Sequence, residues 1–306
     1  MSAGDWLDTY PRVLVNEPLA RHSQFGVGGP ADWFITTRDV AVLAELLRRC
    51  TASGISVTMV GAGSNALISD SGIQGLVVRH NDRRVRVADA HTIELGGGCM
   101  MPRVALDCAS RGLAGLEFGI GVPGTCAASV FGNAGAFGTE VADVLIDCTS
   151  LSPSGEPLTL PAAACGFKYR HSRFKDDLRG HAIVSARLRV HEDDPDRVRE
   201  RTDSIQAERK ASQPYGIRSL GSVFKNPPDD RAGRLIEAAG LKGRRSGGAQ
   251  ISPKHANFIV NVDQATAADV LNLVRVAHDA VHEQFGVDLE REIIVLGGLE
   301  PGDHHD

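Results

Sequence analysis

Apolar residues recur in this chain at two spacings, which predict both helices and strands. Across residues 39–50, apolar side chains return every three or four positions, the spacing of a helix with one buried face. Gly54 stands where such a helix needs a C-terminal cap. Apolar runs at 33–35 and 55–60 predict buried strands on either side of it. The chain is therefore expected to open as strand, helix and strand.

The same patterns predict further elements. Helices are expected at 102–111, with a proline near the first turn, and at 196–211, where charged residues indicate a solvated surface. A third helix begins at Thr266, followed by Asp269 as in a capping box, and runs through Phe285. Shorter apolar or alternating stretches predict strands at 76–78, 85–87, 92–95, 144–152, 182–191 and 290–296.

Composition and charge indicate a globular protein and argue against nucleic-acid binding and membrane insertion. A chain of 306 residues can bury two or three cores, and 42% hydrophobic and 23% charged residues are typical of a globular protein. A net charge of −5 with mixed signs argues against general nucleic-acid binding. No apolar stretch approaches the ~18 residues of a membrane span. Residues 1–8 lack the features of a signal peptide, so we expect a cytoplasmic protein without membrane insertion.

Neither the cysteines nor the C-terminal tail predicts a metal site. The 6 cysteines are spread along the chain without a CxxC pair, so we expect buried free thiols and disfavour zinc sites and disulfide frameworks. The tail at 303–306 reads Asp-His-His-Asp, and we expect it to lie in solvent. No metal is therefore predicted.

A glycine-rich loop at 61–65 directly follows a predicted strand. Its glycines allow backbone N–H groups to converge on an anion, and its serine and asparagine add donors, so it suits a phosphate group. The pattern is not G-x-G-x-x-G, and 66–69 continues as an extended segment, which disfavours a Rossmann site. A tight turn without a ligand is the alternative. The candidate cofactor-binding residues are Gly61, Gly63, Ser64 and Asn65.

A second stretch of small residues covers 119–138. Such a density of small side chains makes a poor core by itself, and it suits backbone lying against a large flat ligand with a diphosphate. A close-packed turn between elements is the alternative. We expect cofactor contacts from Gly124, Thr125, Ala128, Ser129, Asn133 and Gly135.

Two further segments carry groups suited to binding and catalysis. In 167–174 aromatic and cationic residues alternate, and the guanidinium of Arg170 can bind a carboxylate through two parallel hydrogen bonds. A basic surface strand is the alternative. Elsewhere, a small-residue turn presents the hydroxyl of Ser222 close to Lys225 and Asn226, which suit an anion. An ordinary junction between strand and loop is the alternative there.

Two more segments offer acid–base candidates. Glu292 precedes an apolar run that resembles a strand returning to a sheet, although a simple strand edge is the alternative. The segment 254–261 contains His255, for which we favour a role in packing or in a turn over a catalytic one.

Taken in this order, these segments resemble the UDP-N-acetylenolpyruvoylglucosamine reductase family of peptidoglycan synthesis. The resemblance runs from about residue 16 to residue 298, and it is closest to the shorter branch, type II, which lacks a lid segment. Each piece is short, but their joint order and spacing are specific. The resembling pieces are 27–32, 61–65, 115–118, 123–125, 133–138, 169–172, 221–227, 254–261 and 289–293.

The resemblance implies an α+β fold in separate domains. Residues 1–193 would form an FAD-binding domain of the PCMH or vanillyl-alcohol-oxidase type, with subdomains of about 1–80 and 81–193. Residues 194–287 would form an α+β substrate-binding domain, and 288–306 a C-terminal strand returning to the active site. An acidic, proline-containing stretch at 193–196 is consistent with the main boundary.

The resemblance also implies a chemistry with FAD and NADPH as cofactors. NADPH would reduce FAD and leave, and hydride would then pass to C3 of the enolpyruvyl ether of UDP-N-acetylglucosamine-enolpyruvate, giving UDP-N-acetylmuramate. Arg170 and Glu292 match the residues that stabilise an enolate-like intermediate, and Glu292 would have to carry or share a proton to do so. Ser222 matches the residue that protonates C2. The substrate-binding candidates are Tyr169, Lys225 and Asn226.

The chain departs from the family pattern in places. Gly26 stands where an arginine is common, Cys-Ala-Ala-Ser at 126–129 replaces a common Val-Gly-Gly-Ala, and Gly132 replaces a larger residue. Two alternatives to the reductase hypothesis follow. One is a flavin reductase of the same fold that acts on another enolpyruvyl or nucleotide sugar, and the other is a catalytically silent nucleotide-binding protein. We expect a monomer that acts on a small molecule.

Overall fold

A computed structural model describes residues 4–298, and the tail at 303–306 lies outside the described residues. The chain divides into two compact units. The first comprises Met1–Val15, Trp33–Ala62 and Gly75–Arg209. The second comprises Asn16–Asp32, Gly63–Gln74 and Lys210–Asp306. Two short N-terminal segments therefore group with the C-terminal third of the chain.

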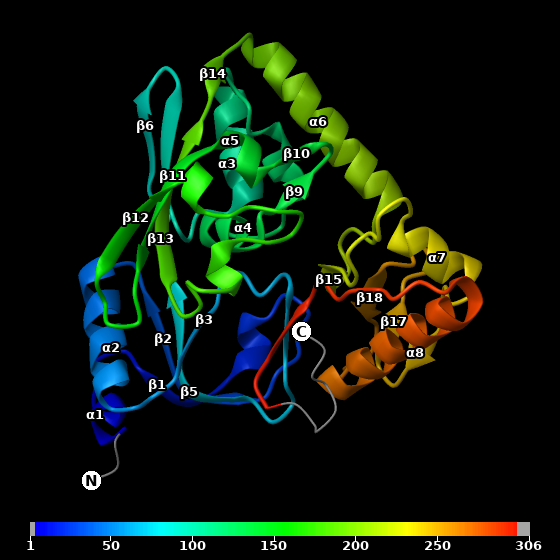
Figure 1. Cartoon of the computed structure of the whole chain (residues 1–306), viewed down its shortest axis with the longest axis horizontal. Helices are drawn as coiled ribbons and strands as arrows, with labels where there is room; N and C mark the ends of the chain where they lie inside the picture. Colours follow the sequence, from blue (N-terminus) through cyan, green and yellow to red (C-terminus); the bar gives the residue numbers. More distant parts are fainter. Residues whose placement is uncertain (1–3, 299–306) are drawn as a thin grey trace. The chain divides into compact units, whose positions relative to one another are not determined.

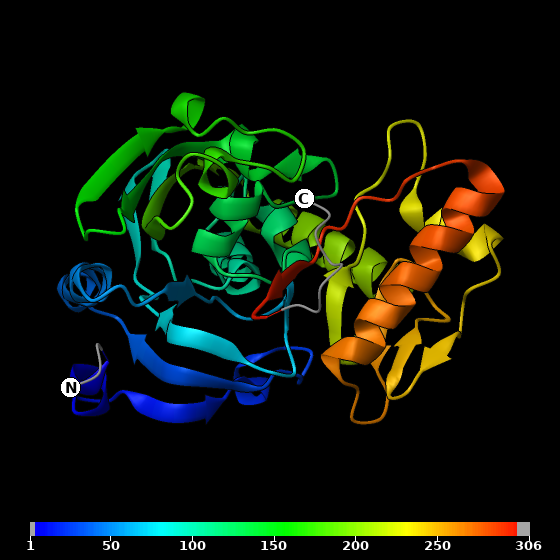
Figure 2. The same cartoon turned by 60° about the horizontal axis from the view of Figure 1, so that its bottom comes forward.

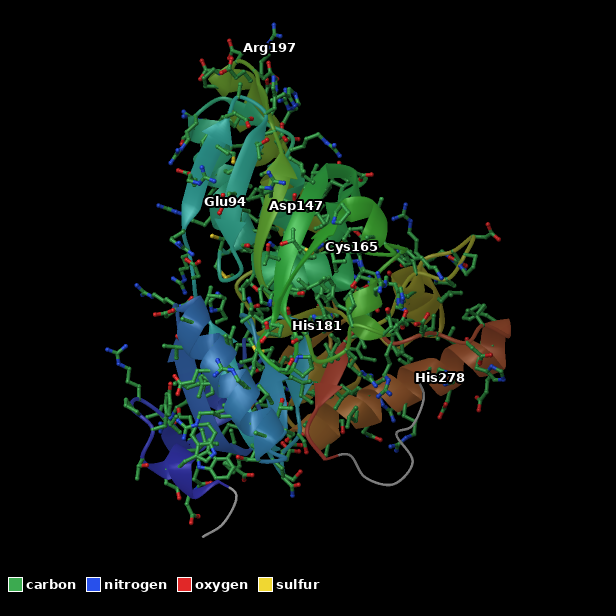
Figure 3. All side chains as sticks on the ribbon, turned by 60° about the vertical axis from the view of Figure 1, so that its left-hand side comes forward. Glu94, Asp147, Cys165, His181, Arg197 and His278 are labelled. Carbon is green, nitrogen blue, oxygen red and sulfur yellow. The ribbon has the colours of Figure 1, made fainter. Side chains whose placement is uncertain are left out.

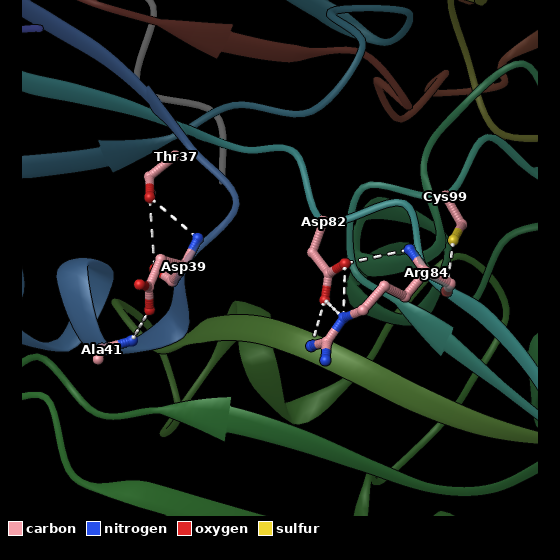
Figure 4. A network of polar contacts seen from close by, with 6 residues as sticks. All are labelled: Thr37, Asp39, Ala41, Asp82, Arg84 and Cys99. Carbon is pink, nitrogen blue, oxygen red and sulfur yellow. Dashed lines mark hydrogen bonds and ion pairs between the residues drawn. The ribbon is translucent and has the colours of Figure 1, made fainter.

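The N-terminal part contains a four-stranded sheet in the order β1-β2-β5-β3. Helix α2 (Val40–Ala52) packs on it through its buried face, in a core shared with Ile35, Leu76 and Val78 (Figure 1). Asp39 caps this helix by accepting a hydrogen bond from the amide of Ala41 at 2.8 Å, as drawn in Figure 4. The elements here are α1 (Asp5–Asp8), β1 (Leu14–Pro18), β2 (Pro30–Thr37), β3 (Val57–Met59) and β5 (Ile73–His80).

The rest of the first unit contains a five-stranded antiparallel sheet in the order β12-β11-β13-β7-β6. Helices α3 (Met101–Ser110) and α4 (Cys126–Gly132) lie on one face of it (Figure 1). The strands are β6 (Val85–Asp89), β7 (Thr92–Gly96), β11 (Leu145–Leu151), β12 (Pro157–Pro161) and β13 (Ala182–Arg189).

Short elements complete the first unit. Strand β8 (Leu113–Ala114) pairs with β14 (His191–Glu192), and β9 (Gly135–Ala136) pairs with β10 (Thr139–Glu140). The remaining helices are η2 (Glu117–Gly121), α5 (Val141–Val144), η3 (Ala162–Ala164), η4 (Arg173–Lys175) and α6 (Pro195–Ser212), which runs across the division between the units. Only Val198 and Thr202 of α6 are buried, which confirms its predicted solvated surface.

The second unit contains a four-stranded antiparallel sheet in the order β15-β18-β17-β16. Helix α8 (Ala267–Phe285) lies along this sheet (Figure 2) and buries Val270, Leu273 and Val281 in the core of the unit. A parallel pair joins β4 (Ala66–Ile68) to β19 (Ile294–Leu296). The other elements are η1 (Leu19–His22), β15 (Ser219–Ser222), α7 (Ala232–Ala238), β16 (Arg245–Ser246), β17 (Ala249–Ile251) and β18 (Phe258–Asn261).

Of three local predictions, the structure confirms one and differs from two. The capping box is confirmed, because Thr266 Oγ1 accepts from the amide of Asp269 at 3.1 Å while the Asp269 carboxylate accepts from the amide of Thr266 at 3.0 Å. The C-terminal strand begins only at Ile294, later than predicted. Residues 126–132 form a helix where a loop was expected, because Thr125 caps a first turn there.

The cysteines are buried free thiols, as predicted. Cys148 and Cys165 lie side by side with their sulfurs 3.8 Å apart, and Figure 3 shows Cys165 within the first unit. Burial raises the pKa of Cys50 and Cys99 to about 11, so both thiols stay protonated at neutral pH.

His80 makes the stability of the first unit depend on pH. Its ring is 6% exposed, and neither ring nitrogen has a hydrogen-bond partner within residues 4–298. Burial lowers the pKa of His80, and this outweighs the opposing effect of the Asp82 and Asp39 carboxylates, while Arg84 adds to the lowering. The folded state therefore prefers the neutral ring. Stability is full above the unfolded pKa of about 6.5 and declines as the pH falls through the folded value.

We expect the melting temperature to fall as the pH is lowered from about 7.5 to about 5.5, and His80→Phe to weaken that dependence. His181 and His255 have lowered pKa values too, so part of the dependence remains. The measurement is thermal unfolding across this pH range, with His91→Gln as the control at an exposed histidine. An unchanged pH dependence in His80→Phe would contradict this assignment.

Candidate active site

Two of the loops predicted to hold a cofactor meet within the first unit. A Cβ atom placed on Gly61 would lie 2.8 Å from Thr125 Oγ1 and 3.6 Å from the Ala128 Cβ. Any residue larger than glycine at position 61 would therefore push these two segments apart. The close approach of the 61–62 backbone to the turn at Thr125 fits a cradle for a nucleotide cofactor such as FAD.

The backbone amides in the first turn of helix α4 donate hydrogen bonds to acceptors within the protein. Those of residues 126 and 127 donate to carbonyls in the segment 97–99 at 2.8 and 3.0 Å. The amide of Ala128 donates to Thr125 Oγ1 at 3.3 Å, and Ser129 donates both its amide and its hydroxyl to the Thr125 carbonyl. These groups therefore already have acceptors. Ala128, whose side chain is exposed, is the member of this helix that remains accessible to a cofactor.

Asn133 has hydrogen-bond partners within the protein. Its side chain is fully buried, and its Nδ2 donates to the Glu140 carboxylate at 2.8 Å and to the Lys168 carbonyl at 3.0 Å. Its Oδ1 accepts from the amide of Ala142 at 2.9 Å. Both amide hydrogens of Asn133 are thereby used within the protein. The cofactor contacts expected of Asn133 and Gly135 stay predictions.

Arg170 lies at the tip of a tight, strained turn. Lys168 and His171 exchange backbone hydrogen bonds of 3.2 and 3.0 Å around it. The backbone of Arg170 is left-handed, with φ +54°, a conformation that costs a residue with a side chain about 1 kcal/mol or more. Its guanidinium donates to the Gly135 carbonyl at 3.0 Å and lies 5.1 Å from the centre of the Tyr169 ring. Such strain is typical of functional positions.

Side chains from neighbouring segments hold this turn in place. Asn133 reaches the Lys168 carbonyl, and Lys175 Nζ donates to the Arg170 carbonyl at 2.7 Å. Ser172, also fully buried, donates to the Phe131 carbonyl at 2.6 Å. The roles of Asn133 and Ser172 as supports for Arg170 cannot be predicted from the sequence, where both are marked only by a position inside the motifs at 133–138 and 169–172.

In the second unit, a β-bulge sets the position of Ser222. Ser219 lies opposite Val260 and Ser222 opposite Phe258, so β15 carries one residue more than β18 between these pairs. Gly221 fills the bulge with φ +75°, a conformation that favours glycine. A bulge of this kind re-aims the next side chain. The glycine of the Gly-Ser pair therefore determines where the half-buried Ser222 points.

The chain returns beside Ser222 near its C-terminus. The carbonyl of Val223 accepts from the amide of Glu292 at 2.8 Å and from that of Ile293 at 3.3 Å. Phe224 forms an isolated antiparallel bridge with Arg291. This pairing explains why β19 starts late, because the residues before it pair with the segment that follows Ser222. Ser222 and Glu292 thus lie on two adjacent backbone segments.

Asn65 holds the returning segment from another side. Its Nδ2 donates to the Glu292 carbonyl at 2.9 Å, and its own carbonyl accepts from the amide of Ile294 at 2.9 Å. The side-chain amide of Asn65 therefore already has a protein partner. Gly63, with φ +65°, packs against the backbone of His22 and Ser23, where a Cβ would come within 3 Å. The loop at 63–65 is thus fixed in the second unit.

Lys225 and Asn226, predicted to bind an anionic part of the substrate, also have partners within the protein. The ammonium of Lys225 pairs with the carboxylate of Glu290, and its backbone amide donates to the Glu290 carbonyl at 2.9 Å. Asn226 Oδ1 accepts from the amide of Ala232 at 3.2 Å, at the start of α7. A phosphate at Lys225 would therefore replace the exposed Glu290 carboxylate as its counter-ion.

The departures from the family pattern have different structural contexts. Gly26 has φ +81°, and a Cβ on it would contact the guanidinium of Arg218. Arg218 therefore occupies the space that a side chain at position 26 would need. Ala127 packs beside the core of the first unit, and a Cβ on Gly132 would meet no atom within 4 Å. Nothing in the structure explains the glycine at position 132.

His255 has a packing role, as favoured from the sequence. Its ring lies 4.9 Å from that of Phe258, and its Nδ1 accepts from the amide of Asn257 at 3.2 Å. Burial lowers the pKa of His255, to which the nearby Lys242 adds. A neutral ring is required for Nδ1 to accept, so the hydrogen bond and the burial agree.

The site residues are thus divided between the units. Arg170, Tyr169 and the Gly61–Thr125 contact belong to the first unit, whereas Ser222 and Glu292 belong to the second.

Residues 4–298 contain no group of histidine, cysteine, aspartate or glutamate side chains arranged to hold a metal ion. The helices within the same residues include none long and apolar enough to cross a membrane.

The chain is similar to known proteins in both of its parts. Residues 31–161 match an FAD binding domain, and residues 213–296 match the UDP-N-acetylenolpyruvoylglucosamine reductase, C-terminal domain. The chain is 43% identical over 289 residues to UDP-N-acetylenolpyruvoylglucosamine reductase 2 of Symbiobacterium thermophilum, which covers 94% of this chain and 92% of that one. It is 41% identical to the reductase of Novosphingobium aromaticivorans, with 94% and 96% covered.

A solved structure gives the same result. The crystal structure of UDP-N-acetylenolpyruvylglucosamine reductase from Thermus caldophilus matches with a TM-score of 0.79 and 33% identity, covering 93% of this chain and 98% of that one. The predicted α+β fold class, with an FAD-binding domain and a C-terminal domain, is thereby confirmed. The chain belongs to the UDP-N-acetylenolpyruvoylglucosamine reductase family, FAD-dependent oxidoreductases of peptidoglycan synthesis that use NADPH and act on a UDP-sugar.

Proposed function

We propose that this chain reduces the enolpyruvyl ether of UDP-N-acetylglucosamine-enolpyruvate to UDP-N-acetylmuramate in two separate half-reactions. NADPH and the enolpyruvyl substrate use one binding site in turn. The observation that supports the proposal is the hydrogen bond from the Glu292 amide to the Val223 carbonyl, which places the backbone of Glu292 beside the residue that follows Ser222. The residues proposed as acid and as charge-stabilising group therefore lie on adjacent backbone segments.

FAD fits the residues present. The backbone at Gly61, the turn at Thr125 and the exposed Ala128 would hold it, together with the loop at 63–65. Bound there, FAD would supply the hydride-transfer chemistry that links NADPH to C3 of the substrate. The absence of a second dinucleotide motif supports the use of one site by both reactants in turn.

Each catalytic side chain has a separate task. Arg170 binds the substrate carboxylate through its guanidinium, where negative charge gathers once C3 has received hydride. Glu292, in its protonated form, donates a hydrogen bond to the same charge. Ser222 gives its hydroxyl proton to C2, a C–H bond forms as the O–H bond breaks, and the resulting alkoxide regains a proton from water.

Binding roles follow from the same chemistry. Lys225 exchanges Glu290 for the substrate diphosphate, and Asn226 adds a donor through its Nδ2 group. Tyr169, 47% exposed beside the Arg170 guanidinium, contacts the substrate. We further propose a cytoplasmic monomer with functional domains at 1–193, 194–287 and 288–306. This division differs from the compact units, which assign 16–32 and 63–74 to the second unit and divide the chain after residue 209.

The proposed scheme predicts steady-state kinetics of the ping-pong type. Double-reciprocal plots at several NADPH concentrations should give parallel lines, because one reactant leaves before the other binds. Each reactant should also inhibit at high concentration, because NADPH would then occupy the reduced enzyme and the enolpyruvyl substrate would occupy the oxidised enzyme. Intersecting lines without such inhibition would contradict a shared site.

Substrate identity and the silent alternative need a separate test. The purified protein should be yellow, with oxidised flavin absorbing near ~450 nm, since this is general flavin chemistry. A colourless protein that cannot be loaded with FAD would favour a silent nucleotide-binding protein. Faster turnover with a different enolpyruvyl or nucleotide sugar would favour a related reductase.

A further inference from the structure

Asn257 is a buried polar residue to which the proposed chemistry gives no role. It lies directly before β18, within the segment 254–261, and its side chain is 3% exposed. A buried amide must find hydrogen-bond partners, because leaving them out costs free energy. The partners of Asn257 therefore indicate what it is for.

The partners of Asn257 are backbone groups just after Ser222. Its Oδ1 accepts from the Phe224 amide at 2.9 Å, and its Nδ2 donates to the Phe224 carbonyl at 2.8 Å. Its own carbonyl accepts from the Val223 amide at 2.9 Å. The side-chain amide thus forms the pair of bonds that a residue of a neighbouring strand would form. It continues the pairing of β15 past the point where that strand ends.

The opposite edge of the same segment bonds to the returning chain. The Val223 carbonyl accepts from the Glu292 amide, and the Lys225 amide donates to the Glu290 carbonyl at 2.9 Å. Residues 223–225 are therefore held between Asn257 on one edge and residues 290–292 on the other. Asn257 is the side chain that completes this frame, and the frame carries Ser222 at one end and Glu292 at its edge.

The orientation of Asn257 is fixed in turn by its neighbours. His255 Nδ1 accepts from its backbone amide at 3.2 Å. Ser252 Oγ accepts from the amides of Lys254 and His255 at 3.2 and 3.3 Å, which closes the turn before β18. Asn257 is therefore held rigidly enough to position the backbone that it contacts.

We propose that Asn257 is a positioning residue for proton delivery: by clamping Phe224 it fixes the Ser222 hydroxyl relative to Glu292. This inference rests on the proposed function, in which Ser222 protonates C2. Proton transfer depends steeply on donor geometry, and a misplacement of about 1 Å can cost about 10²-fold in rate. Loss of the clamp should slow the proton-dependent half-reaction and leave the other one intact.

The test compares Asn257→Asp and the milder Asn257→Ser with a matched control, Asn261→Asp. Aspartate at 257 still accepts from the Phe224 amide but loses the donor to the Phe224 carbonyl. Asn261, at the other end of β18, likewise donates to a backbone carbonyl, that of Phe25 at 3.0 Å, and accepts from the amide of Ala265. The same chemical change is thereby made outside the frame.

Each variant, loaded with FAD, is followed by stopped-flow absorbance in both half-reactions and in H₂O and D₂O. For the Asn257 variants we expect flavin reduction by NADPH within about twofold of wild type and flavin reoxidation by the enolpyruvyl substrate slowed at least ~10-fold. The solvent isotope effect on reoxidation should rise, because proton delivery becomes rate-limiting. Asn261→Asp should show neither change.

Several outcomes would overturn the inference. These are equal slowing of both half-reactions, an unchanged isotope effect, or Asn257 variants that fail to fold while Asn261→Asp folds, since each would make the role of Asn257 purely structural. Ser222→Ala separates this failure from failure of the proposed function. If Ser222→Ala reoxidises as fast as wild type, the proposed function is wrong about the proton donor. If it is slow while the Asn257 variants are normal, only the inference fails.

Discussion

Ser222→Ala is expected to slow reoxidation of the reduced flavin by the enolpyruvyl substrate at least ~10²-fold, the usual contribution of a positioned acid. Flavin reduction by NADPH should stay near the wild-type rate, because that half-reaction needs no acid. The measurement is stopped-flow absorbance of each half-reaction separately. The substitution removes one oxygen atom from a half-buried side chain in a bulge fixed by Gly221, so little structural change should accompany it.

Ser219→Ala is the matched control, because Ser219 is also half-buried and lies at the other end of β15. It should leave both half-reactions unchanged. If Ser222→Ala instead slows flavin reduction and spares reoxidation, the segment around Ser222 belongs to the nicotinamide site and the proton donor lies elsewhere.

Arg170→Lys is expected to slow the same half-reaction by about 10²- to 10³-fold, the scale associated with removing a preorganised group that stabilises charge in the transition state. Lysine keeps the positive charge but loses the planar fork that binds a carboxylate through two hydrogen bonds. It would also lose the hydrogen bond to the Gly135 carbonyl that anchors the guanidinium. Stopped-flow absorbance of both half-reactions checks this prediction, and flavin reduction by NADPH should again be spared.

Arg173→Lys is the control for this change. Arg173 lies in the same segment, but its guanidinium pairs with the Asp177 carboxylate at the surface.

The double variant Arg170→Lys with Ser222→Ala should be less impaired than the product of the two single effects, because both groups act on one intermediate. Fully multiplicative effects would indicate that the two residues act in different steps.

The sequence predicted those elements whose signals are local. Helix α8 is an example, because its capping box at Thr266 and its apolar spacing both lie within the helix itself, and the structure contains both. Helix α2 is similar, with Asp39 at its start and Gly54 in the left-handed conformation just past its end. For such elements, side chains and backbone a few residues apart decide the structure.

The sequence did not reveal features that depend on contacts between distant segments. Helix α4 was expected to be a loop, because its small residues suggested exposed amides, yet those amides are bonded to Thr125 and to the segment 97–99. Asn133 and Asn257 look alike in the sequence as single polar residues within motifs. Only the fold shows that one supports the Arg170 turn and the other clamps the backbone after Ser222.

The predicted catalytic residues Arg170, Ser222 and Glu292 came from matching motifs, and the structure adds a local backbone feature at two of them. Arg170 adopts a left-handed backbone, with φ +54°, at the tip of its turn. Ser222 follows a glycine bulge. Neither feature is visible in composition or periodicity, because both arise from the pairing of the surrounding backbone.

The most direct test of the central claim is a single anaerobic turnover. The FAD-loaded protein is reduced with one equivalent of NADPH, freed of nucleotide and mixed with UDP-N-acetylglucosamine-enolpyruvate, while absorbance near ~450 nm is followed. We predict that the absorbance returns to its oxidised level and that one equivalent of UDP-N-acetylmuramate forms for each flavin. Flavin that stays reduced in the presence of excess substrate would contradict the account.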